Sequence, residues 1–276
     1  KKKKNIGNNS LSKNTTGTQN TAVGSLAGDA HTTGANLTAL GYFAASSNTT
    51  GGANTAIGAS ALGQNTTASN NTAVGKSALK ANTTGGDNTA CGSIARQNNT
   101  TGSNNVAFGR NSLSNCTTGS SNTALGTSAG DVTTTGSNNT TIGSGADPSS
   151  NSASNEVTLG NGSVSSLRCN QTSISSLSDK RDKTDIIDLP LGVEFLNTLR
   201  PVKFKWQRRE PDATDGKVRA GFIAQELQEA QKYFDFLDLV MDSNPDKLEA
   251  KQGNLIPVLV KAIQELSAKV TALEAG

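Results

Sequence analysis

Two stretches that lie one repeat apart indicate the fold of most of this chain. Residues 54–62 read Asn-Thr-Ala-Ile-Gly-Ala-Ser-Ala-Leu, and residues 71–79 read Asn-Thr-Ala-Val-Gly-Lys-Ser-Ala-Leu. Their glycine recurs every 17 residues without one insertion, at Gly7, Gly24, Gly41, Gly58, Gly75, Gly92, Gly109, Gly126, Gly143 and Gly160. An unbroken period of this kind predicts a solenoid-like array in which each repeat is one structural unit.

Each repeat is expected to form a small β unit. Asn-Thr-Ala-Val-Gly at residues 20–24 predicts a short strand, because β-branched residues are bounded by Asn and Gly. The Thr-Thr-Gly segment of each repeat has the chemistry of a second short strand and its turn. An apolar residue stands before every glycine. Together with small alanines such as Ala61, Ala78 and Ala95, it is expected to line a narrow interior.

The repeats are also expected to need partner chains. A single chain of this kind buries too little apolar surface to offset its loss of conformational entropy. Three chains around one axis would close the strand edges and share one core. We therefore predict that residues 5–160 form an all-β, trimeric, parallel β-roll or solenoid. The predicted trimer core is Val23, Leu40, Ile57, Val74, Phe108, Leu125 and Ile142.

Composition excludes several classes of function. Only 33% of the 276 residues are hydrophobic, and the formal net charge is +3. The run Lys1–Lys4 is interpreted as a basic leader or tag, so no nucleic-acid partner is predicted. No apolar stretch approaches the roughly 20 residues of a membrane-spanning helix, and no membrane insertion is expected.

Few residues suit metal or acid–base chemistry. The lone histidine, His31, is interpreted as a surface residue. Three distant cysteines are expected to be unpaired thiols, and no metal or cofactor is predicted: Cys91, Cys116 and Cys169. Asn-Xaa-Thr sequons recur in repeat register, for example at Asn14, Asn48, Asn65 and Asn82, so structural reuse explains them better than glycosylation.

The segments 54–62 and 71–79 resemble the head repeats of trimeric autotransporter adhesins. Similar repeats occur in phage tail fibres, and both kinds are built as trimeric parallel β-rolls. The resemblance extends over about 150 residues, although its motif is short and degenerate. It implies an architecture and does not imply a particular ligand.

The composition changes after the last repeat. Residues 161–177 form a serine-rich linker, and residues 178–276 contain charged residues and the lone tryptophan, Trp206. This second region predicts an α+β domain, with a helix within 190–199, a strand over 202–206, a strand over 221–223 and an amphipathic helix over 224–234. Apolar residues then follow in steps of three and four, which predicts a short trimeric coiled coil: Ile256, Leu259, Ile263, Leu266, Val270 and Leu273.

Four blocks of residues 178–276 resemble the endosialidase-type intramolecular chaperone family. Ser178–Lys183 matches the Ser-Asp-x-Arg-x-Lys opening of that family, and the blocks 199–206, 221–226 and 255–266 follow in the family's order. One departure is Gln252-Gly253-Asn254, where relatives often have an aromatic residue that helps to dock the final helix. The resemblance implies a domain that trimerises, guides folding of the preceding β-fibre and then cuts itself off before the serine.

The resemblance implies that Ser178 attacks the carbonyl carbon of Leu177 and that Lys183 is the base. A serine hydroxyl needs a base to act as a nucleophile near neutral pH. An ammonium group with an ordinary pKa of about 10.4 cannot serve until burial or nearby positive charge lowers that value. Arg181 and Lys180 could supply the charge, whereas Asp179 and Asp182 would oppose them unless their side chains point away.

Two functions are compared. The favoured hypothesis is a viral, phage-type tail fibre or spike of the virion, a homotrimer that is structural or binds a glycan or protein receptor on a host cell. The alternative is a bacterial cell-surface trimeric adhesin, although residues 178–276 lack the membrane anchor with which such adhesins normally end. A membrane-tethered transcription factor with the same chaperone domain would need a DNA-binding segment and a transmembrane helix, and neither is expected here.

Overall fold

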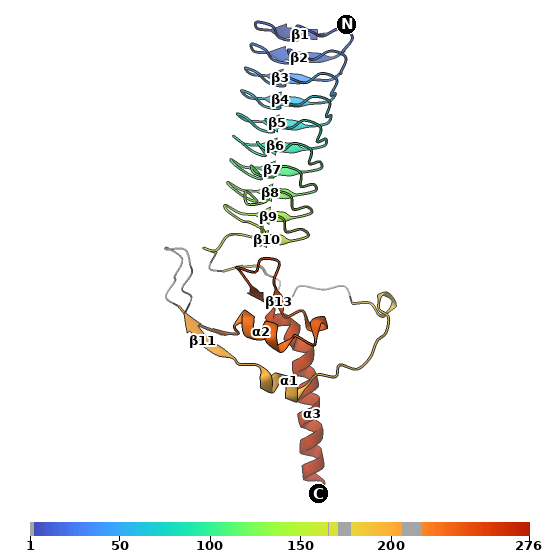
Figure 1. Cartoon of the computed structure of the whole chain (residues 1–276), viewed down its shortest axis with the longest axis vertical. Helices are drawn as coiled ribbons and strands as arrows, with labels where there is room; N and C mark the ends of the chain where they lie inside the picture. The colour runs from blue at the N-terminus through green and yellow to red at the C-terminus, as the bar shows by residue number, and fades with distance from the viewer. Residues whose placement is uncertain (1–2, 165, 171–177, 206–216) are drawn as a thin grey trace. The chain divides into compact units, whose positions relative to one another are not determined.

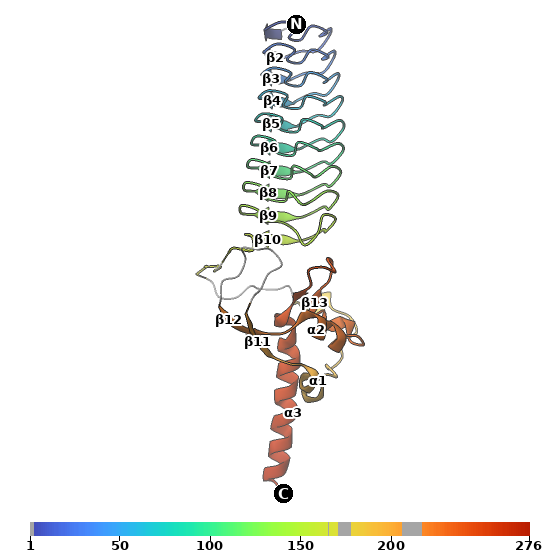
Figure 2. The same ribbon diagram turned by 60° about the vertical axis from the view of Figure 1, so that its left-hand side comes forward.

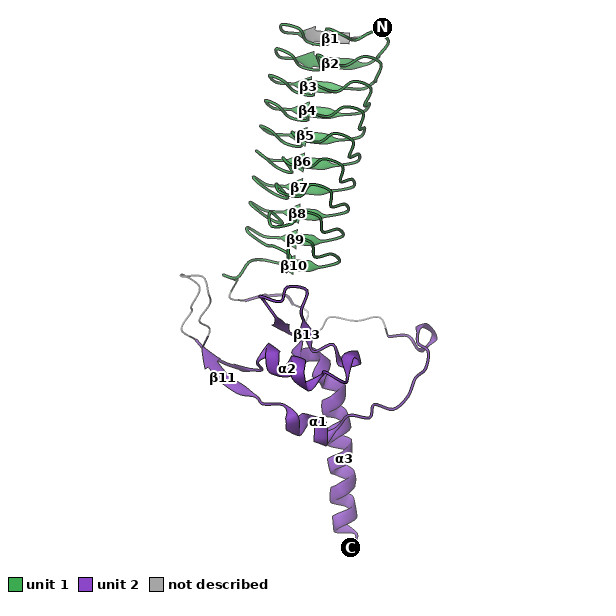
Figure 3. Ribbon diagram, in the orientation of Figure 1, with its two compact units in different colours: residues 1–164 green, residues 165–276 purple. Residues whose placement is uncertain are grey.

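The computed structural model describes residues 3–164, 166–170, 178–205 and 217–276. The chain divides into two compact units, Lys1–Val164 and Ser165–Gly276 (Figure 3). The division falls inside the stretch interpreted as a linker. The finer boundaries drawn from the sequence, at 160/161 and 177/178, stay predictions.

The first unit is a parallel β-solenoid with one short strand in each repeat (Figure 1). Every strand pairs in parallel with the next one, residue for residue at an offset of 17, as in Thr55 with Thr72. The stack is regular from both viewing directions (Figure 2). The predicted solenoid is confirmed, and its strands are β1 (Lys3–Ile6), β2 (Asn20–Val23), β3 (Thr38–Leu40), β4 (Thr55–Ile57), β5 (Thr72–Val74), β6 (Thr89–Cys91), β7 (Val106–Phe108), β8 (Thr123–Leu125), β9 (Thr140–Ile142) and β10 (Val157–Leu159).

The glycine after each strand is required by both conformation and stacking. Gly75 has a φ of +133°, a region that residues with a Cβ atom seldom adopt. A Cβ added to Gly75 would stand 2.4 Å from the carbonyl oxygen of Gly92 in the next repeat. The chain therefore turns at glycine in every repeat because the backbones of successive turns are in direct contact there.

The interior of the solenoid differs from the expected one. The alanine before the last residue of each strand from β2 to β8, such as Ala56 or Ala73, is buried, as is the alanine that most repeats have three residues after the glycine, such as Ala78. The apolar residue before the glycine faces outward instead, because neighbouring residues of a strand point to opposite faces. Val23, Ile57 and Val74 are half-buried, and four others are 40–53% exposed: Leu40, Phe108, Leu125 and Ile142. These residues do not line the interior of a single chain, and their place in a trimer core stays a prediction.

The Thr-Thr-Gly segments do not form the expected second strand within the described residues. They are held by a column of hydrogen bonds instead. The hydroxyl of Thr49 donates to the carbonyl oxygen of Thr66 at 3.0 Å, and Thr83 donates in the same way to Thr100 at 2.9 Å. Because the side chain itself bonds to the next turn, a regular strand ladder is not needed at this corner.

Buried asparagines form two ladders inside the solenoid. In one ladder the Oδ1 atom of Asn54 accepts the backbone N–H of Asn71 at 2.9 Å, and the pattern repeats in later turns. In the other, Asn65 donates to Asn48 Oδ1 at 2.8 Å. Three of the four sequon asparagines, Asn48, Asn65 and Asn82, are fully buried, as expected of structural residues, whereas Asn14 is half-buried. His31 occupies the same column and is also fully buried, so its interpretation as a surface residue is wrong.

The second unit has an α+β fold with an apolar core of aliphatic residues and Phe195. Two antiparallel pairs, β11 with β12 and β13 with β14, accompany three α-helices. Eight buried residues form the core: Leu191, Phe195, Leu227, Leu237, Leu239, Val240, Leu255 and Val258. The elements are η1 (Lys180–Asp182), α1 (Val193–Thr198), β11 (Val202–Lys205), β12 (Val218–Gly221), α2 (Ala224–Ala230), η2 (Asp235–Leu237), β13 (Val240–Met241), β14 (Glu249–Ala250), η3 (Gln252–Leu255) and α3 (Ile256–Glu274).

Two of the expected elements in this unit are shifted. The strand expected over 221–223 is β12, which ends at Gly221, because the chain then turns into α2. The helix expected to reach Phe234 ends at Ala230, and Phe234 instead packs edge-on against Phe195 at 5.8 Å between ring centroids. The strand expected over 202–206 is β11, and Trp206 lies outside the described residues.

Helix α3 has two apolar faces. Val258 and Ala262 are buried against the unit's own core. The six residues predicted to form a coiled coil are exposed on α3, between 45% for Leu259 and 82% for Leu273. The helix and its row of six apolar residues lie where the sequence predicted them, whereas the coiled coil itself stays a prediction. None of the helices in the described part of the chain is long and apolar enough to span a membrane.

Candidate functional site

Ser178 and Lys183 meet across a single turn of 3₁₀ helix. The turn, η1, is closed where the backbone N–H of Lys183 donates to the carbonyl oxygen of Lys180 at 3.2 Å. This turn brings the Lys183 Nζ atom to 2.5 Å from the Ser178 Oγ atom, and the amine donates in that contact. A hydroxyl and an amine are therefore in direct contact, which is the arrangement that a serine–lysine pair would need.

Asp179 and Arg181 form the rest of this turn. Asp179 caps η1 by accepting the backbone N–H of Arg181 at 2.9 Å, and it also forms an ion pair with the guanidinium at 2.6 Å. The Arg181 side chain, helped by that backbone bond, lowers the pKa of Asp179. Asp179 thus points toward Arg181, and its charge offsets the positive charge that was expected to act on Lys183. The two residues shape the turn.

Ser178 and Lys183 are both exposed in the single chain. A lysine that accepts a proton near neutral pH needs cover from water or nearby positive charge. In the described part of the chain the pair is not covered, and Asp179 offsets the charge of Arg181. The other half of the predicted cleavage site, Leu177, lies outside the described residues.

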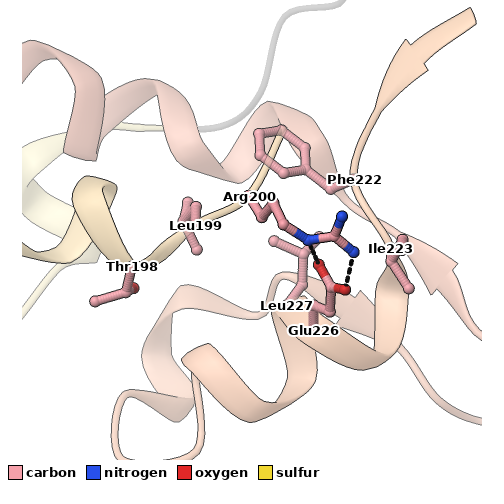
Figure 4. A pocket seen from close by; sticks show the side chains of 7 residues that line it. All are labelled: Thr198, Leu199, Arg200, Phe222, Ile223, Glu226 and Leu227. Carbon is pink, nitrogen blue, oxygen red and sulfur yellow. Dashed lines mark hydrogen bonds and ion pairs between the residues drawn. The ribbon is translucent and has the colours of Figure 1, made fainter. Parts of the chain in front are cut away.

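The second and third family blocks lie side by side in the structure. The antiparallel register of β11 and β12 pairs Val202 with Gly221 and Phe204 with Arg219. Just before β11, Arg200 binds Glu226 of α2, with its Nε atom 3.1 Å from one carboxylate oxygen (Figure 4). The Glu226 side chain raises the pKa of Arg200. A small crevice surrounds this ion pair, lined by Thr198, Leu199, Phe222, Ile223 and Leu227.

Residues 252–255 dock α3 without the aromatic residue that the resemblance led us to expect there. Leu255, at the end of η3, is buried in the core. Asn254 donates to the carbonyl oxygens of Leu237 at 3.2 Å and Asp238 at 2.8 Å. On the next turns of α3, Glu265 accepts the backbone N–H of Val193 at the start of α1, at 3.0 Å. Polar contacts and a buried leucine therefore replace an aromatic anchor.

The segment that begins with Ser178 contains the turn η1 and the paired strands β11 and β12. Residues 178–238 match the protein family described as the chaperone of endosialidase. This segment is an endosialidase-type chaperone domain, and it follows a β-solenoid. The family implies a tail-fibre-like protein with an intramolecular chaperone and a self-cleaving peptidase activity. No curated protein and no solved structure gives a significant match to the chain.

The sequence alone missed several residues that shape the second unit. The ion pair between Arg200 and Glu226 and the contact of Glu265 with Val193 join residues 26 and 72 positions apart. Spacing cannot show such contacts, although Arg200 and Glu226 both lie within the matched residues 178–238. Among the described residues, no group of three or more His, Cys, Asp or Glu side chains is placed to hold a metal ion.

Proposed function

We propose that this chain is a phage-type tail fibre or spike protein whose C-terminal unit helps the solenoid to trimerise and fold, and then cuts the chain before Ser178. The observation that supports this proposal best is the contact between Ser178 Oγ and Lys183 Nζ at the first residues of the matched segment. The fibre that remains is structural or attaches the virion to a glycan or protein receptor on a host cell.

The chemistry follows from the position of the serine. Ser178 supplies the nitrogen of the bond that breaks, so its Oγ atom attacks the preceding carbonyl carbon, that of Leu177. Lys183, in its neutral form, takes the proton from Oγ and returns it to the Ser178 nitrogen as the C–N bond breaks. The first product is an ester between Leu177 and the Ser178 side chain. Water then hydrolyses this ester and releases residues 1–177 with a new carboxylate.

Assembly would control the timing of this cut. The pair is exposed in one chain, and two apolar surfaces are exposed as well: the outward column of the solenoid and the outer face of α3. Apolar stripes of this extent are typical of surfaces that meet other chains. If three copies pack through them, neighbouring subunits can shield Lys183 from water. Cleavage would then occur only after the trimer has formed.

Intact-mass measurement of purified protein tests the proposal. The wild-type chain should separate into residues 1–177 and a fragment that begins at Ser178, without added protease. Ser178→Ala should abolish the cut because it lacks the attacking oxygen. Lys183→Ala should do the same because no base remains, and Lys183→Arg because a guanidinium stays protonated.

Lys180→Ala is the matched control: it removes a positive charge from the same turn but neither the nucleophile nor the base, so it should slow the cut at most. Hydroxylamine should trap the ester as a hydroxamate on Leu177, and Ser178→Ala should give none. All variants are expected to form the same oligomer as wild type, measured by sedimentation. Normal cleavage in both Ser178→Ala and Lys183→Ala would exclude the serine–lysine pair as the catalytic group.

A further inference from the structure

The second asparagine ladder inside the solenoid has a direction. Asn65 donates to Asn48 Oδ1, Asn82 donates to Asn65 Oδ1 at 2.7 Å, and Asn99 donates to Asn82 Oδ1. Each Nδ2 atom also donates to the carbonyl oxygen three residues later in its own turn, as Asn82 does to Gly85 at 2.9 Å. Every amide therefore points its nitrogen toward the N-terminal neighbour and its oxygen toward the C-terminal one.

Arg96 fixes this direction at the C-terminal end of the ladder. The next ladder position holds Cys116, which has no amide to donate. Arg96 instead donates from one nitrogen, Nη2, to Asn99 Oδ1 at 2.8 Å and to the Gly119 carbonyl oxygen at 2.9 Å. These are the two acceptors that an asparagine at position 116 would use. Because a guanidinium can only donate, Asn99 must keep its oxygen toward Arg96.

His31 occupies the position of the same ladder one turn before Asn48. Its Nε2 atom lies 2.9 Å from the Gly34 carbonyl oxygen, so Nε2 carries the proton and donates. Its Nδ1 atom lies 3.0 Å from Asn48 Nδ2 and must accept. His31 is therefore neutral in this geometry. Burial lowers the pKa of His31, while backbone hydrogen bonds to Gly34 and Asn48 oppose the shift.

A protonated His31 would not fit this position. Both ring nitrogens would then donate, and Nδ1 would face the donating amide of Asn48. Asn48 cannot rotate its amide to help, because its nitrogen also donates to the Gly51 carbonyl oxygen at 2.8 Å and its oxygen accepts from Asn65. A reversal would have to pass through every amide to Asn99, where Arg96 prevents it.

We propose that His31 is an acid-sensitive joint of the solenoid, at which mild acid separates the turns of β1 and β2 from the turn of β3. The titratable side chains of these turns whose positions are described lie toward the surface: Lys13 and Tyr42 are exposed, and Asp29 is half-exposed and accepts a hydrogen bond from Ser12. None of them replaces Asn48 as the partner of Nδ1. Asn14 Oδ1, one turn before His31, is buried without a hydrogen-bond partner in the described structure, so the preceding junction, between the turns of β1 and β2, lacks its ladder bond.

Hydrogen exchange read by mass spectrometry tests the joint in the whole protein. The amide of Thr32 donates to Thr49 across the His31 junction at 2.8 Å, and the amide of Thr83 donates to Thr100 across an all-asparagine junction at 3.0 Å. Between pH 7.5 and 5.0, after correction for intrinsic rates, protection near Thr32 should fall by up to about 30-fold, as expected if only the open state binds the proton. Protection near Thr83 should change little.

The variant His31→Asn is the matched comparison, since asparagine is the usual ladder residue and does not titrate. It should abolish the acid-dependent loss near Thr32 and leave the peptide at Thr83 unchanged. Equal pH dependence of the two peptides in wild type would overturn the proposal, even if the variant did not fold. An acid-dependent loss near Thr32 that persists in folded His31→Asn would overturn it as well.

Discussion

The two units bury side chains of different kinds. The solenoid interior consists mainly of alanines and asparagines at a fixed spacing, with fewer leucines such as Leu62 and Leu79, and each turn contacts only its neighbours. The C-terminal unit buries large apolar residues such as Phe195, Leu227 and Leu239, which come from distant positions in the chain. Burying an alanine removes far less apolar surface from water than burying a leucine or phenylalanine.

This difference indicates an order of folding. A solenoid turn closes only when its neighbour supplies the matching carbonyls and amides, so the first turns form at a high cost in entropy. The C-terminal unit has an apolar core of its own and can fold before the repeats do. Three such units held together would supply the nucleus that a stack of weakly cohesive turns lacks.

The largest expected effect concerns how residues 1–177 are produced, either alone or by release from the whole chain. Residues 1–177 synthesised alone should aggregate or stay unfolded, because the first turns then have no nucleus on which to stack. The same residues released by self-cleavage should remain folded and trimeric. Circular dichroism and sedimentation of the two preparations, which have identical sequences, would measure this. Equal yields of folded trimer from both routes would show that the C-terminal unit is not a folding aid.

Two glycine substitutions, one in each unit, compare how closely the backbone is packed at the two positions. Gly75→Ala should destabilise the solenoid by more than about 4 kcal/mol, since its Cβ would collide with the backbone of the next turn at a positive φ. A Cβ added to Gly253 of the second unit would have no heavy atom within 4 Å, and Gly253→Ala should change stability by less than about 0.5 kcal/mol. Urea unfolding, followed separately in each unit, gives both values. Similar losses at the two positions would contradict this account of the stack.

The third prediction concerns the one buried cation of the described solenoid turns. Arg96 is fully buried in a column that holds Leu62, Leu79 and Leu113, and its Nε and Nη1 atoms have no hydrogen-bond partner in the described structure. Arg96→Leu together with Cys116→Asn would restore the regular repeat. We expect the double variant to be more stable than wild type. The new asparagine amide would donate to Asn99 Oδ1 and to the Gly119 carbonyl oxygen, and no charge would be buried.

The single variants provide the control for this prediction. In the presence of Arg96, an asparagine at 116 would compete for the same two acceptors, so Cys116→Asn should help only after Arg96→Leu. A double-mutant cycle by thermal unfolding should give a coupling of about 2–3 kcal/mol. Additive effects would show that the arginine does not stand in for the missing amide.

Much of the fold was predictable because repetition makes a weak signal strong. Glycine, alanine and an apolar residue at a constant offset predicted the parallel solenoid, and the steps of three and four predicted α3. The direction of the outward apolar column was misjudged, although strand alternation could have shown that it faces away from the alanines. His31 was misplaced because it was judged as an isolated residue, not as a member of the column of Asn14 and Asn48.

The sequence by itself determined the 17-residue stack, the change of composition at the second unit and the family blocks that begin with Ser178. Only the tertiary structure decided which side chains meet across these elements. Ser178 and Lys183 touch because η1 is a tight turn, and Arg96 takes the place of an amide missing from a residue twenty positions away. The physical reason is that a sequence pattern records periodic burial, whereas a hydrogen bond depends on the path of the backbone and the direction of each donor.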